Sequence, residues 1–183
     1  MSVRDLSLHI LDVIENSVRA GASEVRVTIC QDVRDDLLTV AIEDNGPGLE
    51  VPAEVAVQPF YTTKKDKRVG LGLSLFRAAA EQAEGGLAVQ RSRLGGLAVE
   101  ARMRLSHVDR SPLGDVAAVV SAIVCTNPDL DLCCTFSVEP RRLTVRVSDV
   151  LQSLLPEQRC GLTVARGMAE RVRQAIEELE IKP

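Results

Sequence analysis

The segment Leu11–Ala22, LDVIENSVRAGA, carries side chains whose types and spacing could serve a metal–phosphate ligand. Successive residues of a helix lie about 100° apart, so Asp12, Asn16 and Arg19 share one polar stripe. Glu15 points away from Asn16. An asparagine carbonyl suits Mg²⁺, arginine pairs with phosphate, and a carboxylate one turn earlier can orient a water. Taken alone, a solvated helix face is the simpler interpretation of this segment.

A second candidate lies in the sequence EDNGPGL, where a predicted strand ends at Asp44. A carboxylate at a strand end can accept a hydrogen bond from an exocyclic amine such as N6 of adenine. Gly46 and Gly48 would let the backbone approach a flat ring closely. A simple turn explains the same residues, because turns prefer Asp, Asn, Gly and Pro.

A third candidate is the sequence VGLGLSL, in which Gly70 and Gly72 precede a predicted helix. The free N–H groups of the first helical turn would face a phosphate there. The spacing is neither GxGxxG nor the Walker A pattern. A helix start with small residues is the plain alternative.

A fourth candidate is the sequence PFYTTKK, which sets Lys64 and Lys65 beside two threonines and the neighbouring aromatics Phe60 and Tyr61. This composition suits a lid that closes over a polyphosphate. A charged surface loop is the default interpretation of such a segment.

The elements that must position these residues follow from the periodicity of the apolar side chains. In chain order the sequence predicts a helix over 5–20, strands over 23–31 and 37–44, a mobile loop over 49–69, a helix over 71–83 and two strands within 85–105. A helix, two strands, a loop, a helix and two strands make a two-layer α/β sandwich, which is an α+β fold.

The composition changes at residues 106–115, which are polar and contain a proline and a glycine. Beyond them we predict a helix over 115–125, a hairpin over 132–138 and 142–147, and C-terminal helices. We therefore expect a principal domain over residues 1–106 and a small α+β appendage over 107–183.

The composition excludes several classes of protein. The chain has 183 residues, 45% of them apolar, and a net charge of -4 from 22 basic and 26 acidic residues, with no basic block to follow a nucleic acid backbone. No apolar run approaches the length of a spanning helix and the N-terminus is charged, so we expect no membrane insertion and a cytoplasmic protein. The five cysteines are odd in number and form no CxxC pair, which predicts small buried hydrophobes in a reducing compartment.

Taken together and in order, IENSVRAGA, DNGPGL, PFYTTKK and GLGLSL resemble the N, G1, F and G2 boxes of the GHKL ATPases. This is the superfamily of gyrase, the heat-shock chaperone, histidine kinases and MutL. The resemblance covers Leu6 to Leu105. This region looks most like histidine kinase ATP-binding domains, although its segment VIENSVRAGAS looks more like MutL. It implies a Bergerat-type sandwich that holds ATP between sheet-flanking helices under a lid.

The resemblance also implies roles for single residues of the opening helix. Asn16 resembles the asparagine that chelates Mg²⁺, and Arg19 the basic residue that reaches phosphate. Where members of the superfamily use a general base, it lies four residues before the asparagine, which is Asp12 here and not Glu15. The position holds Asp rather than the longer Glu, which shortens its reach to a water.

The other boxes carry over in the same way. Asp44 resembles the adenine-reading aspartate, with Gly46 and Gly48 beside it. The glycines at the triphosphate and the lysines of the lid correspond to Gly70, Gly72, Lys64 and Lys65. This sequence departs from many kinases after its second glycine pair, where Leu97 stands in place of a threonine near the adenine.

The sequence SHVDRSPL resembles the phosphoacceptor box of histidine kinases, with His107 as the acceptor. That box normally precedes the ATP-binding domain and begins a helical hairpin, whereas here it follows the domain. A linker shaped by proline and glycine is the alternative interpretation.

We expect a Mg²⁺-ATP-binding, histidine kinase-like protein that acts on a separate partner protein, as a protein kinase or as an ATP-dependent signalling switch. Slow ATP hydrolysis would need only Asp12 and a water. The alternative is a non-catalytic interaction module that keeps the sandwich with weak or no nucleotide binding. The sequence leaves the oligomeric state open, and a homodimer is one possibility.

Overall fold

The computed structural model describes residues 5–48 and 72–182 of the chain. The expected mobile loop over 49–69, which contains Lys64 and Lys65, lies outside these residues, and so does Gly70. The elements are α1 (Leu6–Arg19), β1 (Glu24–Asp32), β2 (Leu37–Asp44), α3 (Gly72–Gln82), β3 (Gly86–Arg91), β4 (Leu97–Arg104), α4 (Val116–Thr126), β5 (Asp131–Val138), β6 (Arg141–Arg146), α5 (Val147–Ser153), a 3-10 turn (Pro156–Gln158) and α6 (Gly161–Glu178). Each helix and strand predicted within the described ranges is present, with ends that differ by a few residues.

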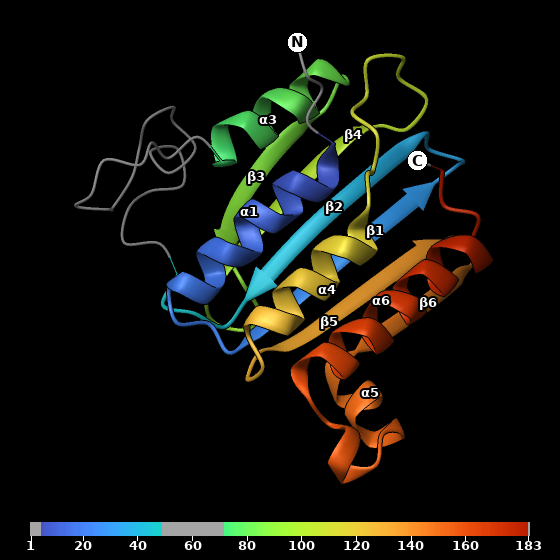
Figure 1. The fold of residues 1–183 in the computed structure, drawn as a ribbon. Coiled ribbons are helices and arrows are strands. Elements are labelled where there is room, and N and C mark those ends of the chain that lie inside the picture. Colours follow the sequence, from blue (N-terminus) through green and yellow to red (C-terminus); the bar gives the residue numbers. More distant parts are fainter. Residues whose placement is uncertain (1–4, 49–71, 183) are drawn as a thin grey trace.

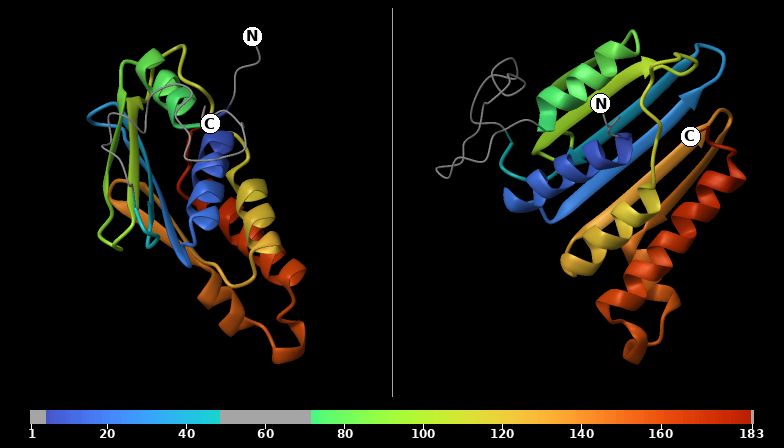
Figure 2. Two further views of the ribbon diagram at one scale, coloured as in Figure 1. Left: turned by 90° about the vertical axis from the view of Figure 1, so that its left-hand side faces the viewer. Right: turned by 45° about the horizontal axis from the view of Figure 1, so that its top comes forward.

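The strands in this part of the chain form one mixed sheet with the order β3-β4-β2-β1-β5-β6. Neighbouring strands are antiparallel except β1 and β5, which are parallel. Helices α1, α3, α4 and α6 lie on one face of this sheet, as the two turned views show most directly (Figures 1 and 2). The predicted two-layer α+β sandwich is confirmed.

Helix α1 has defined signals at both ends. The carboxylate of Asp5 accepts a hydrogen bond from the backbone N–H of Leu8 at 3.2 Å, which satisfies one free donor of the first turn. After the last turn Gly21 takes a φ of +94°, a left-handed conformation that favours glycine at a helix end. Between these ends Leu6, Ile10 and Ile14 are fully buried against the sheet. The polar stripe of α1 is therefore held in one orientation.

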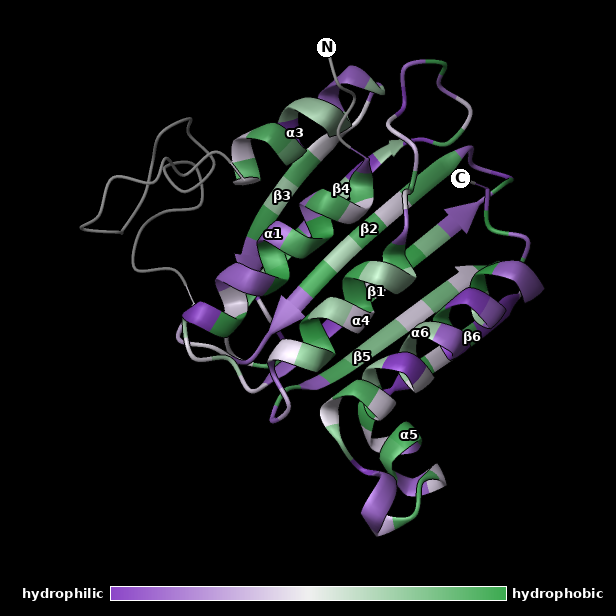
Figure 3. Cartoon of the chain, viewed as in Figure 1, coloured by the Kyte–Doolittle hydropathy of each residue, from purple (hydrophilic) through white to green (hydrophobic). Residues whose placement is uncertain are grey.

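One hydrophobic core runs through both halves of the chain. Helix α4 is apolar along most of its length and lies over the sheet, whereas hydrophilic residues alternate with apolar ones along α6 (Figure 3). Ile29 of β1 pairs in register with Phe136 of β5, and both are fully buried. The segment after residue 106 thus extends the same sheet and core.

The predicted boundary at residues 106 and 107 falls in the connection between β4 and α4. The predicted helix and hairpin beyond it are present, but the parallel pairing of β5 with β1 is not visible in the sequence pattern. The division of the chain into two domains stays a prediction.

The cysteines occupy different environments. Cys133 and Cys134 are buried in β5, and burial raises the pKa of the Cys134 thiol. Cys125 and Cys160 are exposed, so the prediction of buried cysteines is wrong for these two.

Within the described ranges no helix combines the length and the hydropathy needed to cross a membrane.

Candidate functional site

The carboxylate of Asp44 is the most constrained polar group of the candidate site. Asp44 ends β2 and is 5% exposed. Its Oδ1 atom accepts hydrogen bonds from the backbone N–H groups of Gly46 at 2.9 Å and Leu97 at 3.0 Å. Its Oδ2 atom accepts from the hydroxyl of Ser17 at 2.6 Å. Three donors therefore fix the carboxylate, and such bonds to an ionised acceptor are among the strong ones.

Two turns meet at Asp44 through glycines. The backbone N–H of Gly96 donates to the carbonyl of Asp44 at 3.1 Å. A Cβ atom on Gly96 would overlap the carboxylate of Asp44 and the backbone nitrogen of Gly46. Gly48 has a φ of +79°, and a Cβ atom there would lie 3.5 Å from the carbonyl oxygen of Gly96. The glycines thus permit the turn after β2 to pack directly on the turn before β4.

A second group of site residues gathers where α3 begins. A Cβ atom on Gly72 would lie 3.6 Å from Cβ of Asp12, 3.8 Å from its Oδ2 and 3.9 Å from Nδ2 of Asn16. The first residue of α3 therefore faces the polar stripe of α1. The fold brings Gly72 next to Asp12 and Asn16, which lie more than fifty residues before it in the sequence.

Arg19 contacts the same stripe from the end of α1. Its Nη2 atom donates to Oδ1 of Asn16 at 2.8 Å. Its Nη1 atom lies 3.5 Å from Oε2 of Glu15. Both charged side chains are about half exposed, with values of 51% and 46%, so this ion pair adds little to stability. Of the two acids on α1, Glu15 contacts Arg19, whereas Asp12 lies next to Gly72.

Helix α1 connects the two groups through adjacent residues. Ser17 bonds the carboxylate of Asp44, and Asn16 faces Gly72. The Ser17 hydroxyl also lies 3.2 Å from the carbonyl of Val13. Ser17 was not among the predicted site residues, although its place beside Asn16 on the buried side of the helix was a signal for it.

Leu97 departs from the family pattern, in which many kinases have a threonine near the adenine. In the structure it supplies a backbone N–H to Asp44, which any residue except proline could do. Its side chain packs against the hydrophobic core. The sequence could not indicate this contact, because it comes from the backbone.

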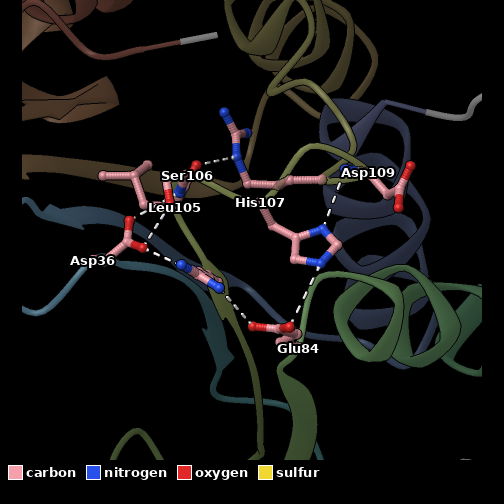
Figure 4. A network of polar contacts seen from close by, with 8 residues as sticks. Asp36, Glu84, Leu105, Ser106, His107 and Asp109 are labelled. Atoms are coloured by element: carbon pink, nitrogen blue, oxygen red, sulfur yellow. Dashed lines mark hydrogen bonds and ion pairs between the residues drawn. The ribbon is translucent and has the colours of Figure 1, made fainter.

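His107 does not join these residues. It lies in the loop after β4, where Nδ1 accepts a hydrogen bond from the backbone N–H of Asp109 at 3.1 Å and Nε2 lies 3.9 Å from Oε1 of Glu84 (Figure 4). Glu84 follows the C-terminal end of α3, whereas Gly72 begins that helix. A helix of 11 residues is about 16 Å long. His107 and the polar stripe near Gly72 are thus separated by the length of α3.

The loop at His107 belongs to a chain of exposed ion pairs. Arg104 contacts Asp36 at 2.9 Å and Glu84 at 3.0 Å, and the hydroxyl of Ser106 donates to Asp36 at 2.6 Å. The hydrogen bond from Ser106 and then the one from Arg104 lower the pKa of the Asp36 carboxyl. These contacts connect the loop to Asp36, just before β2, and to Glu84, just after α3.

Comparison with protein families matches residues 2–107 to the family described as histidine kinase-, DNA gyrase B-, and HSP90-like ATPases. The match covers more than half of the 183 residues. The chain belongs to this family and carries a histidine kinase-like ATP-binding domain.

Among curated proteins, the chain is 32% identical over 103 residues to the sensor protein kinase CarS of Pseudomonas aeruginosa, covering 55% of this chain and 22% of CarS. It is 29% identical over 92 residues to the sensor histidine kinase CpxA of Escherichia coli, covering 47% of this chain and 20% of CpxA. The chain thus spans about a fifth of the length of these relatives.

The solved structures that are similar to the chain include an ATP-binding domain and an ATPase domain. The ATP-binding domain of PrrB from Mycobacterium tuberculosis matches with 27% identity and a TM-score of 0.41 over 53% of this chain and 64% of that one. The MutL ATPase domain of Aquifex aeolicus complexed with ADP matches with 17% identity and a TM-score of 0.42 over 76% of this chain and 62% of that one.

Proposed function

We propose that the chain binds Mg²⁺-ATP between α1, the first turn of α3 and the end of β2, and that the nucleotide serves phosphoryl transfer or switching on a separate partner protein. The observation that carries the proposal is the link through α1, in which Ser17 holds Asp44 while the neighbouring Asn16 faces Gly72. Adenine and the phosphates would then contact two groups of residues that are joined through adjacent positions of α1.

Asp44 would read the adenine ring. A carboxylate offers about four lone-pair sites, and Gly46, Leu97 and Ser17 occupy three of them. The site that is left, on Oδ2, suits a donor such as the N6 amine of adenine. Because the carboxylate is already held by three donors, little ordering would be needed on binding.

Asn16, Arg19 and Gly72 would take the phosphate end. The side-chain oxygen of Asn16 fits Mg²⁺, an ion that typically takes one or two protein oxygens and keeps waters and substrate phosphates as its other ligands. When bound, Mg²⁺ would neutralise charge on the phosphates. The first turn of α3, which begins at Gly72, would present free N–H groups to a phosphate oxygen. The roles inferred for Lys64, Lys65 and Gly70 concern residues outside the described ranges.

Asp12 would act as general base. Its carboxylate lies one turn before Asn16 and beside Gly72, on the side of the helix where the phosphates are proposed. A water or an acceptor hydroxyl held by Asp12 would lose its proton as the phosphoryl group is attacked. Turnover through a water gives slow hydrolysis, and turnover through a protein acceptor gives a kinase.

The sensor kinases CarS and CpxA support a signalling role. Because His107 is separated from the proposed phosphate end by α3, an acceptor on a partner protein or on a second copy of the chain is the more direct choice. The partner would be a protein, with a homodimer as one arrangement. The proposed setting is the cytoplasm.

Thermal unfolding of the full chain with and without Mg²⁺-ATP tests this proposal. Nucleotide at about 100 times its Kd should stabilise the native state by about 2.7 kcal/mol and raise Tm by roughly 5–10 °C. An unchanged Tm at millimolar Mg²⁺-ATP would favour the interaction module without nucleotide. Labelled ATP then separates the two reactions, because a kinase leaves label on a protein and an ATPase releases free phosphate.

A further inference from the structure

Helix α3 contacts α1 at a second point beyond Gly72. The imidazole ring of His9 on α1 stacks on the ring of Phe76 on α3, with centroids 5.1 Å apart and planes inclined by 3°. His9 is 2% exposed and Phe76 is fully buried. This contact belongs to no part of the proposed chemistry.

The stack lies on the same helical face as the phosphate-facing residues. At 100° per residue, His9, Asp12 and Asn16 fall within an arc of about 60° on α1. Phe76 comes one turn after Gly72 on α3. The two helices therefore touch along one seam, with the polar contacts at one end and the aromatic stack at the other.

Two flat rings in contact restrict how one helix can slide or rotate on the other, because a shift of either helix breaks the parallel arrangement. The turn that presents free N–H groups begins at Gly72, one turn from Phe76. A rotation of α3 on α1 would move those donors away from Asn16. The donors that hold the Asp44 carboxylate come from Ser17 on α1, Gly46 after β2 and Leu97 on β4, and these three residues lie outside α3.

We propose that His9 is a positioning residue for nucleotide binding, and that its stack on Phe76 sets the first turn of α3 for the phosphates but not the Asp44 end for the adenine. This inference rests on the proposed function. The inference predicts different effects on the phosphate and adenine parts of the ligand. Loss of the stack should weaken the binding of ATP and ADP but leave the binding of adenosine unchanged.

Calorimetric titration of the full chain with ATP, ADP and adenosine in the presence of Mg²⁺ tests the inference. His9→Leu places an apolar side chain in the buried site and removes the flat ring, whereas His9→Phe keeps a flat ring and is the matched control. His9→Leu should raise the Kd of ATP about tenfold, the equivalent of one charge-assisted hydrogen bond, and that of adenosine by less than about twofold. His9→Phe should stay within about twofold of the unmodified chain for all three ligands.

Phe76→Leu removes the other ring of the stack, on α3, and replaces His9→Leu in the test if that variant does not fold. Equal losses for ATP and adenosine in these variants would mean a purely structural role and would overturn the inference, as would unchanged ATP affinity. Absence of binding in the unmodified chain would instead remove the proposed function itself.

Discussion

Arg19 donates a hydrogen bond to the side-chain oxygen of Asn16 at 2.8 Å, so the oxygen proposed for Mg²⁺ already faces a cation. A guanidinium and a Mg²⁺ ion favour the same negative end of the amide dipole but cannot occupy the same direction. When Mg²⁺-ATP binds, Arg19 is expected to exchange Asn16 for a phosphate oxygen, which is a stronger acceptor for its planar fork.

Arg19→Met should therefore separate binding from stability. The Arg19 contacts are half exposed, so Tm should change little. The Kd of Mg²⁺-ATP should rise about tenfold through loss of a charge-assisted bond to phosphate, while adenosine should bind as before. Arg34→Met, at an exposed position in the β1–β2 loop, is the matched control. Similar losses for ATP and adenosine in calorimetry would count against the phosphate role.

Gly72→Ala should stabilise the fold or leave it unchanged while it weakens nucleotide binding. The added Cβ would meet Asp12 and Asn16 at 3.6 Å or more, which is ordinary van der Waals contact. In a helix interior alanine is favoured over glycine by about 1 kcal/mol, and at Gly72, the first residue of α3, this gain is smaller. The methyl group would, however, stand in the space proposed for the phosphates.

The control for that variant is Gly86→Ala, because a Cβ atom on Gly86 has no neighbour within 4 Å. Thermal unfolding and ATP titration of both variants decide the matter. Unchanged ATP affinity in Gly72→Ala would place the phosphates elsewhere.

Asp12→Asn should reduce phosphoryl turnover by about 100-fold or more, a typical contribution of a general base, because the amide cannot take a proton. Nucleotide affinity should stay within about threefold, since the substitution preserves size and removes a negative charge near the phosphates. Glu15→Gln is the matched control, because Glu15 pairs with Arg19 at 3.5 Å and is not among the groups beside Gly72. Free phosphate or labelled acceptor measures the rate, and loss of turnover in Glu15→Gln alone would reverse the assignment.

The contacts of Asp36 predict a stability difference that depends on pH. The hydroxyl of Ser106 and then Arg104 lower the pKa of Asp36 below its ordinary value of 3.8. A carboxyl group whose pKa is lower in the folded than in the unfolded state stabilises the fold at a pH above its unfolded pKa. This stabilisation is lost as the pH falls through its folded pKa. The advantage of the unmodified chain over Asp36→Asn should thus be full above about pH 4 and decline below it.

Asparagine suits the test because Asp36 has a φ of +51°, a conformation that asparagine tolerates. Urea unfolding of both proteins at pH 6 and pH 3 measures the difference. A difference that grows toward pH 3 would contradict the sign of the shift.

The order of helices and strands could be predicted because it depends on local periodicity. The apolar face of α1 and the alternation in β1 and β2 are visible within single segments. The parallel pairing of β1 with β5 could not be predicted in this way, because it joins segments about a hundred residues apart with no local signal.

The candidate site shows the same limit. Asp12, Asn16 and Asp44 were singled out by type and spacing, and the fold gives each a definite surrounding. Ser17 and the backbone N–H of Leu97 were missed, because their importance comes from a carboxylate that approaches them in space. Side-chain type is a weak guide where the backbone supplies the donor.

The most direct measurement is calorimetric titration of the full chain and its Asp44→Asn variant with Mg²⁺-ATP. Asparagine can still accept from Gly46 and Leu97 through its oxygen and donate to Ser17 through its nitrogen, so the variant should fold with a similar Tm. Its amide nitrogen would face the adenine N6 amine with a donor in place of an acceptor. Glu43→Gln is the matched control, because the neighbouring side chain on β2 points to the opposite face of the sheet.

The account predicts saturable binding for the unmodified chain and for Glu43→Gln, and loss of measurable binding in a folded Asp44→Asn variant. Binding that is equally tight in Asp44→Asn, or no binding in the unmodified chain at millimolar Mg²⁺-ATP, would contradict it.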